Sequence, residues 1–261
     1  MTAITVTLSG STGTAALAVK VLTGAAASQP GDVVSDTTAA SAAITPAGNG
    51  SLVYGAYQTF IGSGASYPYS VTGATQVISD AANGSARQAV NLRSTATTTA
   101  GTPVTLGVVA EGGESSFSLA LCEILASGTL AEDASSPATV PLSGASTMTP
   151  VSSLTTASFS PPAGALLVAM GSTGSGTPTI SDSSGLTWTK QASAVASSIS
   201  AAVWTAQIAG GGGGTTYSSY PSGTPHPVPT EPNIFTGTDT NANVGQPGNL
   251  GAALGTPYGV A

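Results

Sequence analysis

The feature that most constrains the fold of this chain is a stretch of sequence that occurs twice. Residues 37–54 read TTAASAAITPAGNGSLVY, and residues 155–168 read TTASFSPPAGALLV. Each copy begins with Thr-Thr-Ala, reaches a Pro-Ala-Gly corner and continues as an apolar run. A pattern shared over this length indicates that the chain contains an internal repeat.

The sequences on either side of the two copies also correspond. Upstream, Val19–Leu22 corresponds to Cys122–Leu125, and downstream, Val77–Asp80 corresponds to Thr179–Asp182. Several matching words in the same order, about a hundred residues apart, indicate a duplicated module of roughly domain size.

The composition favours an all-β fold. The 261 residues include 34 Gly and 17 Pro, and no window repeats apolar residues with a helical period over three turns. Short runs of Val, Ile and Thr alternate with small residues between Gly/Ser/Asn clusters, which is typical of many short strands. Disorder is disfavoured because 41% of the residues are hydrophobic and the net charge is only −7. The runs expected to supply the core are Ser51–Phe60, Thr102–Ala110, Ser118–Leu125 and Ala165–Met170.

We therefore predict two tandem, closely packed β-sandwich modules of jelly-roll-like type. The first spans residues 1–125 and the second spans 117–210. Strand 117–125 is ambiguous, because by position it closes the first module, whereas by similarity to residues 17–22 it opens the second. No sequence after the second module matches the first module's final strands, 102–125.

The C-terminal part differs in composition. Residues 211–232 are Gly-rich and then Pro-rich, which predicts a linker that is first flexible and then extended. Residues 233–261 contain few core-sized side chains, so they form either an extended arm that orders against a neighbour or the start of a further β-domain. The candidate assembly contacts in this part are Tyr217, Tyr220, Ile234, Phe235 and Tyr258.

The charges and apolar runs exclude several partners. Lys20, Arg87, Arg93 and Lys190 are the only fixed cations and lie apart, which disfavours nucleic acid and anionic lipid surfaces. The longest apolar run, Ala163–Met170, is far shorter than the ~20 residues that a membrane span needs. The N-terminal residues lack the features of a signal peptide. A chain with so few charges is expected to work within an assembly, as a homo-oligomer or with other proteins.

Residues suited to nucleophilic or metal chemistry are scarce. The one histidine, His226, stands in Pro-His-Pro within the linker, and Cys122 is expected to be a small buried hydrophobe. Asp80 and Asp182 follow an Ile-Ser pair in each repeat, where Ca²⁺ binding is an alternative to the favoured reading, an aspartate that starts a turn. We predict no catalytic residue, metal or cofactor.

Two carboxylate pairs leave one enzymatic alternative open. Glycoside hydrolysis uses two acids, and the closest pairs are Glu111 with Glu114 and Glu132 with Asp133. Both pairs are expected in Gly/Ser-rich turns, where acids are normally solvated, so an enzyme is disfavoured. The glycines also lack the ending of a phosphate-binding loop.

The aromatic residues are the candidate binding groups. Tyr67 and Tyr69 flank Pro68 on an expected loop, and Trp188 is expected in a strand of the second module. Exposed rings of this kind stack on sugars or anchor protein partners. The alternative is that Trp188 and Trp204 belong to the core and that the tyrosines only pack their own loop.

The second module resembles a known group of proteins. It is similar to β-rich modules in minor tail proteins and other structural proteins of tailed phages that infect actinobacteria. The resemblance covers residues 117–210, more loosely 15–125, and Ile234–Asp239 is similar to the opening of a β-sandwich domain in such proteins. The stretches that carry it are Leu121–Leu125, Ala131–Asp133, Ser136–Thr139, Thr155–Val168 and Ile180–Thr189.

This resemblance implies a non-enzymatic virion structural protein of the tail or tail tip, made in the host cytoplasm. Such a protein would assemble with other virion proteins through its β-modules and C-terminal arm, and would contact the host surface. The alternatives are a capsid decoration or head-fibre protein and a carbohydrate-binding receptor adhesin that recognises a host glycan. The resemblance brings no catalytic residue with it.

Overall fold

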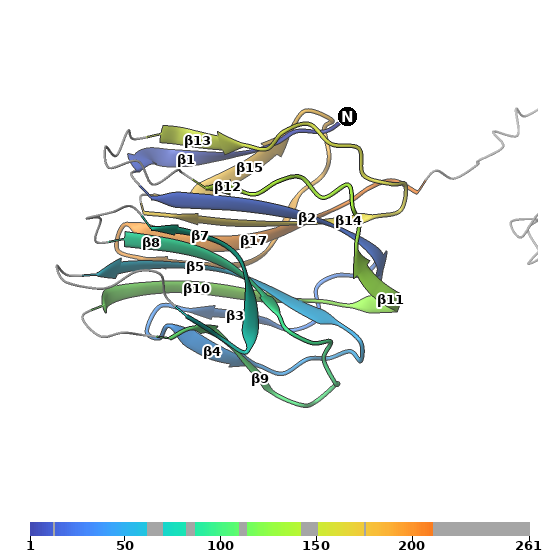
Figure 1. Cartoon of the computed structure of the whole chain (residues 1–261), viewed down its shortest axis with the longest axis horizontal. Helices are drawn as coiled ribbons and strands as arrows, with labels where there is room; N and C mark the ends of the chain where they lie inside the picture. The colour runs from blue at the N-terminus through green and yellow to red at the C-terminus, as the bar shows by residue number, and fades with distance from the viewer. Residues whose placement is uncertain are drawn as a thin grey trace, which may run out of the picture. The chain divides into compact units, whose positions relative to one another are not determined.

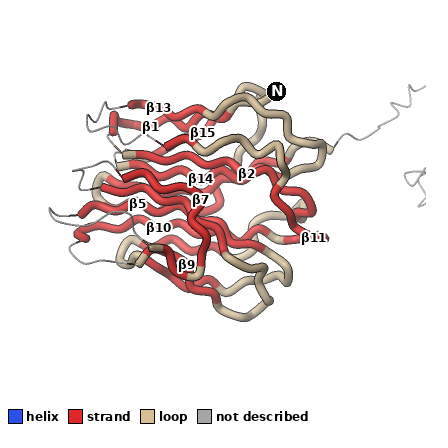
Figure 2. Tube along the Cα trace, viewed as in Figure 1, coloured by secondary structure: helices blue, strands red, loops and turns tan. Residues whose placement is uncertain are grey.

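A computed structural model describes the fold, and its described part is built from strands without a helix (Figure 2). The prediction of an all-β sandwich is therefore confirmed. The predicted linker, 211–232, and arm, 233–261, lie outside the described residues. The described residues are 1–12, 14–61, 70–81, 87–109, 114–141, 151–174 and 176–210.

Two sheets form what we call sandwich A. Its outer sheet has the order β13 (Val151–Thr155), β1 (Ile4–Thr12), β15 (Pro178–Asp182). Its inner sheet has the order β11 (Ala126–Glu132), β2 (Ala15–Ala25), β14 (Leu166–Thr173), β17 (Ile199–Gln207), β16 (Thr189–Ala196), with β12 (Val140–Pro141) also paired to β2.

Two further sheets form sandwich B. Its inner sheet has the order β3 (Val33–Asp36), β10 (Glu114–Ile124), β5 (Leu52–Ile61), β8 (Arg87–Ser94), β7 (Ala74–Ala81). Its outer sheet has the order β4 (Ser41–Ile44), β9 (Val104–Val108), β6 (Val71–Thr72). Figure 1 shows the sheets stacked, from β13 and β1 at one side to β4 and β9 at the other.

Three hydrophobic cores fill the spaces between the four sheets. The central core joins the inner sheets, with Leu22 and Val168 from sandwich A and Tyr54 and Cys122 from sandwich B. Each sandwich also has its own core between its inner and outer sheets. Because successive side chains of a strand point to opposite faces, the central strands of the inner sheets contribute side chains to two cores and are largely buried on both faces. Strand β14, whose eight residues are all buried, is an example.

The order of strands reveals an exchange between the repeats. The inner order β11-β2-β14-β17-β16 corresponds position by position to β3-β10-β5-β8-β7, and the outer order β13-β1-β15 corresponds to β4-β9-β6. Along the chain, strands β1–β8 are therefore one repeat and strands β9–β17 the next, with β12 additional. Each repeat places its first two strands in the sandwich of the other: β1 and β2 lie in sandwich A, and β9 and β10 lie in sandwich B.

This exchange accounts for the ambiguous strand. Strand β10 opens the second repeat by sequence, and it pairs with β5 and β3 of the first. The predicted module ranges, 1–125 and 117–210, follow the order of the sequence, whereas the sheets combine strands within 4–25 and 126–207 in sandwich A. Strands equivalent to 102–125 are thus found at the start of the chain, as β1 and β2.

Strand pairing also corrects the sequence-based alignment of the two repeats. Downstream, the match of Val77–Asp80 to Thr179–Asp182 was wrong, because these residues lie in β7 and β15, which are not equivalent strands. Upstream, the correction is one residue. Leu22 pairs with Leu166, and Ile124 pairs with Leu52, so Leu22 corresponds to Ile124. The sequence-based match of Val19 to Cys122 was wrong, because Val19 faces an outer core and Cys122 faces the central core. A one-residue slip exchanges the two faces of a strand, so Val19–Leu22 corresponds to residues 121–124.

The free edges of the inner sheets carry the same irregularity. The pairing of β16 with β17 shifts between Lys190 and Ala192, and the pairing of β7 with β8 shifts between Gln76 and Ile78. Bulges of this kind twist an edge strand and hinder pairing with another chain. Their matching positions support the equivalence of β16 and β7.

Candidate functional site

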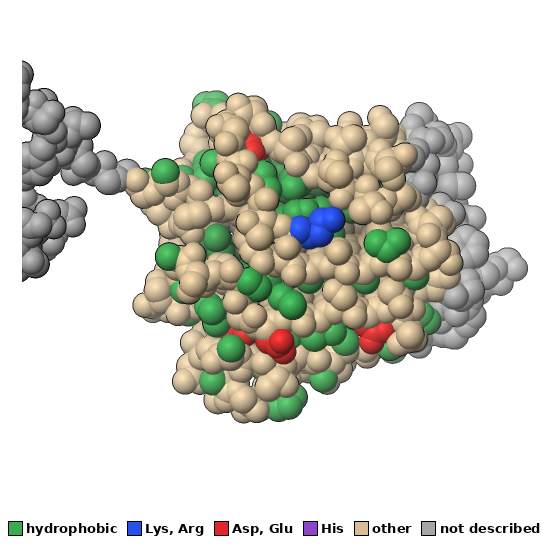
Figure 3. Space-filling view, turned by 180° about the vertical axis from the view of Figure 1, so that it is seen from behind, with side chains coloured by type: hydrophobic (Ala, Val, Ile, Leu, Met, Phe, Trp, Pro, Cys, Tyr) green, Lys and Arg blue, Asp and Glu red, His purple; other side chains and the backbone are tan. Residues whose placement is uncertain are grey.

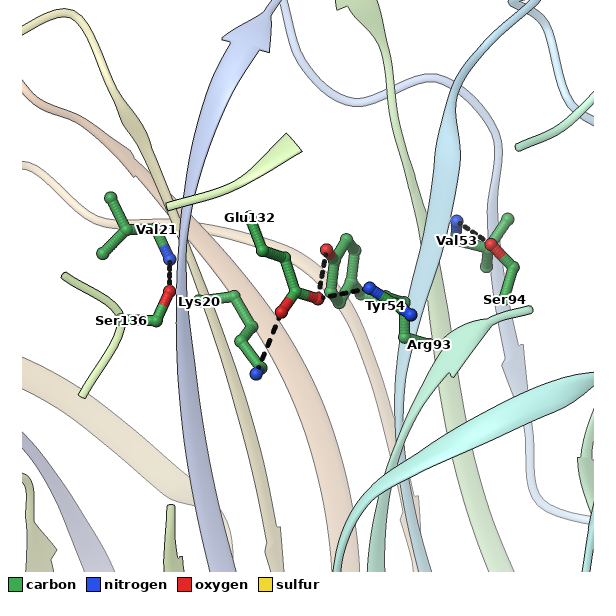
Figure 4. Close-up of polar contacts among 8 residues, drawn as sticks. All are labelled: Lys20, Val21, Val53, Tyr54, Arg93, Ser94, Glu132 and Ser136. Atoms are coloured by element: carbon green, nitrogen blue, oxygen red, sulfur yellow. Dashed lines mark hydrogen bonds and ion pairs between the residues drawn. The ribbon is translucent and has the colours of Figure 1, made fainter. Parts of the chain in front are cut away.

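A cluster around Glu132 joins the two sandwiches. From sandwich A, Lys20 of β2 places its Nζ 3.1 Å from Glu132 Oε2 at the end of β11. From sandwich B, Arg93 of β8 approaches Glu132 Oε1 at 2.9 Å, and the Tyr54 hydroxyl of β5 donates to the same oxygen at 3.1 Å. Figure 4 shows the carboxylate between these three side chains.

The charges in this cluster support one another. Burial raises the pKa of Glu132, but the hydrogen bond and charge of Lys20, followed by the charge of Arg93, outweigh this effect and hold the pKa below its ordinary value. Burial and the Glu132 charge raise the pKa of Tyr54 well above its ordinary value. At neutral pH, Glu132 is therefore an anion between two cations and Tyr54 is a neutral donor. This arrangement suits a structural tie between the sandwiches.

Uncharged polar groups cross the same interface farther along the strands. The Asn91 side chain of β8 donates to the Met170 carbonyl of β14 at 3.1 Å, and Ser172 Oγ lies 3.4 Å from Asn91 Oδ1. The Ser118 hydroxyl of β10 donates to the Ile199 carbonyl at 3.2 Å. Buried polar atoms are costly to leave unpaired, so these bonds favour one register between the inner sheets.

A second carboxylate, Glu123, holds the first Pro-Ala-Gly corner. Its side chain is fully buried, and it accepts backbone N–H bonds from Asp32 at 2.8 Å, Ala47 at 2.8 Å and Gly48 at 2.9 Å. A Cβ on Gly31 would lie 2.0 Å from Glu123 Oε2, so a glycine is required beside it. Sequence analysis missed this role, although an acidic residue within an apolar strand was the available signal.

The second Pro-Ala-Gly corner is held differently. Val21 stands at the position equivalent to Glu123, given the corrected alignment. There, Gln207 Nε2 donates to the Gly164 carbonyl at 2.9 Å and the Ala165 N–H donates to the Pro162 carbonyl at 3.2 Å. The repeats therefore share strand order and not every side-chain contact.

The carboxylates considered for glycoside hydrolysis lie in different settings. Glu132 ends strand β11, so its predicted place in a solvated turn is wrong: the segment pairs with β2 through an irregular register, which adds Glu132 to the sheet. Asp133 accepts the Ser135 N–H at 2.8 Å, and hydrogen bonding by Ser135, through its side chain and then this N–H, lowers the pKa of Asp133. Glu111 and the side chain of Glu114 lie outside the described residues.

Asp182 is confirmed as a turn-forming aspartate. Its Oδ1 accepts the Ser184 N–H at 2.6 Å, and its Oδ2 accepts the Leu186 N–H at 3.0 Å. The Trp188 indole N–H also donates to Oδ2, at 2.9 Å. The side chain of Asp80 lies outside the description.

The remaining sequence candidates fall into two groups. Trp204 is buried, and Trp188 is half-buried against the outer core of sandwich A, as the core alternative expected. Cys122 is a buried free thiol, and burial raises its pKa to about 12, which confirms its reading as a hydrophobe. The other named candidates lie outside the described residues: Tyr67, Tyr69, Tyr217, Tyr220, His226, Ile234, Phe235 and Tyr258.

Within the described ranges, His, Cys, Asp and Glu side chains form no cluster of three that could hold a metal ion. That same part of the chain has no helix of the length and hydrophobicity needed to cross a bilayer. Comparisons of the chain with protein-family models, with curated protein sequences and with solved structures give no match.

Proposed function

We propose that the protein is a non-enzymatic structural component of a tailed-phage virion, placed in the tail or at its tip. Two independent features support this proposal. The sequence stretches of the second module are similar to those of phage structural proteins, and the fold interlocks two repeats by strand exchange.

The observation that carries the proposal is the interlocking itself. Pulling the repeats apart would break the pairing of β2 with β14 and that of β10 with β5, each along most of the strand length. The Glu132 cluster and the bond of Asn91 to the Met170 carbonyl would break as well. A scaffold of this kind suits a particle that must survive outside the cell.

The charged side chains support the same proposal. Glu132, Lys20 and Arg93 tie the sandwiches together, while Glu123 and Asp182 hold a corner and a turn. In these contacts the charged groups serve the fold, and each is occupied by other groups of the same chain.

The outer surface favours assembly. Figure 3 shows one face of the described part, on which uncharged atoms predominate and charged side chains are scattered. Val33, Val109 and Val195 are among the exposed apolar side chains. With little charge repulsion, such a surface packs readily against copies of itself or other virion proteins.

Antibody labelling of particles tests the proposal. Particles produced from the genome that encodes this chain are purified, and bound antibody is located by electron microscopy. Label at the tail or tail tip is the expected result. Label on the capsid would favour a decoration or head-fibre protein, and absence of the chain from purified particles would overturn the virion proposal.

A further inference from the structure

We propose that copies of this chain assemble by exchanging their N-terminal segment, the consecutive strands β1 and β2, so that the N-terminal segment of one copy completes sandwich A of another. The partner is thus a second copy of the same chain. This inference goes beyond the virion proposal and does not depend on it, because it concerns only how the repeats complete one another.

The N-terminal segment is built as a separable element. Its two strands lie in different sheets and pair only with strands that follow residue 125: β1 lies between β13 and β15, and β2 lies between β11 and β14. The segment is thus inserted in the middle of both sheets of sandwich A. A sandwich A that lacked this segment would expose two unpaired strand edges in each sheet, and such edges pair readily with strands of another chain.

One short connection joins the N-terminal segment covalently to sandwich B, and side chains of β2 such as Ala18 and Leu22 also pack against sandwich B in the central core. Residues 26–32 run along the end of β10, where the Ala26 N–H donates to the Leu125 carbonyl at 2.8 Å and the Gly31 N–H donates to the Glu123 carbonyl at 3.1 Å. Ala27 and Ser28 are exposed where the chain crosses between the sandwiches. The crossing can change direction there without opening a core.

The chain itself shows that these positions in a sandwich accept strands from another repeat. In sandwich B, the positions equivalent to those of β1 and β2 are occupied by β9 and β10, which belong to the second repeat by sequence. Each sandwich is therefore completed by two strands of the other repeat. Exchange between copies would re-form the strand pairings and core contacts of β1 and β2, and would lose the advantage of a tethered partner and contacts of residues 26–32 at the new crossing.

The protein concentration determines whether sandwich A is completed by β1 and β2 of the same chain or of another copy. A short tether acts like a partner at an effective concentration in the millimolar range, so isolated chains at low concentration keep their own N-terminal segment in sandwich A. Copies that fold at high concentration, or that are gathered in an assembly, are expected to exchange. The ratio of exchanged to closed chains should rise about tenfold for a tenfold rise in concentration while exchange is rare.

Cysteine pairing across β1 and β13 tests this exchange in the full-length chain. Thr5 and Thr155 are register partners at the surface, with their Oγ1 atoms 2.9 Å apart. In a Cys122→Ala background, a chain carrying Thr5→Cys is mixed with one carrying Thr155→Cys. The mixture is unfolded, refolded under reducing conditions at several concentrations, and then oxidised.

The expected result is a disulfide-linked pair of chains whose yield follows the refolding concentration. A chain with both substitutions should close on itself when refolded dilute and give a ladder of linked multimers when refolded concentrated. Thr5→Cys mixed with Thr102→Cys, an exposed position in the connection between β8 and β9, is the matched control and should not link. The neighbouring register pair Thr7 and Ser153 replaces the first pair if either variant fails to fold.

The proposal is overturned if the doubly substituted chain closes on itself at every concentration and the mixed single variants never link. It is equally overturned if the Thr102→Cys control links as efficiently, because the disulfides would then report random collision.

Discussion

Strand exchange predicts that the two repeats stay together after the connection between them is cut. Residues 95–103 join β8 to β9, and Ala96 and Thr97 within them are exposed. A protease site inserted between these two residues can be cleaved in the folded protein. Cleavage leaves one fragment that begins with β1 and another that begins before β9, each with its first two strands in the sandwich of the other.

The size of the effect follows from buried side chains. Large apolar residues of this kind each contribute about 1.5–3 kcal/mol on burial, so the seven from β1–β2 contribute about 15 kcal/mol and five from β9–β10 about 11 kcal/mol. Association itself costs about 10 kcal/mol, which leaves about 16 kcal/mol and a picomolar dissociation constant. Half of this net free energy, about 8 kcal/mol, still corresponds to a dissociation constant of about 1 μM. The side chains are Ile4, Val6, Leu8, Leu17, Val19, Val21 and Leu22, with Leu106, Val108, Leu119, Leu121 and Ile124.

Sizing chromatography with mass analysis measures the result. The cleaved protein should elute as one species of unchanged size at micromolar concentration, and guanidinium chloride should separate the fragments, which proves that cleavage was complete. Two separate fragments in the absence of denaturant would refute the reasoning, because each repeat would then have kept its own first two strands.

Three substitutions test the ties within the fold. Glu132→Gln should lower the free energy of unfolding by about 1–2 kcal/mol at pH 7, after allowance for its partial exposure. The folded pKa of Glu132 lies below its ordinary value of 4.5, so its contribution to stability is present above pH 4.5 and is lost as the pH falls through the folded pKa. The denaturant midpoints of the wild type and Glu132→Gln should therefore converge in acid. A difference that stays constant with pH would contradict the assignment. Glu123→Ala should cost about 3–6 kcal/mol, because three backbone donors lose their acceptor, and a loss under about 1 kcal/mol in denaturant unfolding would argue against this role. Gly31→Ala should lower the thermal midpoint because its Cβ meets Glu123, whereas Gly128→Ala, with no atom within 4 Å, should leave it nearly unchanged; equal effects would count against the packing described.

The fold class could be read from the sequence because its signals are local. Alternation and turn residues predicted strands such as Ser51–Phe60, which the structure gives as Leu52–Ile61. The repeat was likewise visible in the two Pro-Ala-Gly corners. Local patterns specify which face of a strand is buried, and they place each apolar run close to its observed position.

Which repeat receives a strand could not be read in the same way. The two inner sheets have the same strand order, so the apolar pattern of β2 or β10 suits the position between β11 and β14 as well as the position between β3 and β5. The choice depends on contacts between residues about a hundred positions apart. The alignment slip at Val19–Leu22 has a similar cause, because both faces of these inner strands are apolar and the pattern does not mark the register.

The candidate site was only partly predictable. Asp182 was recognised, because a turn-starting aspartate bonds to residues next to it in the chain. Glu132 was expected in a turn, because its partners Lys20, Tyr54 and Arg93 come from three distant strands. Glu123 has the same explanation: its backbone donors lie between 75 and 91 residues away.

One measurement tests the strand exchange most directly. Two variants of the full chain are compared in a Cys122→Ala background, Thr5→Cys with Thr155→Cys and Thr5→Cys with Ala43→Cys. Residue 155 is the observed partner of β1 in the second repeat, and Ala43 is an exposed position of β4, the equivalent strand in the first repeat. Strand exchange predicts that dilute, oxidised chains close the first disulfide within one molecule and leave the second pair as free thiols. Closure of the pair with Ala43→Cys and free thiols in the pair with Thr155→Cys would show that each repeat keeps its own strands.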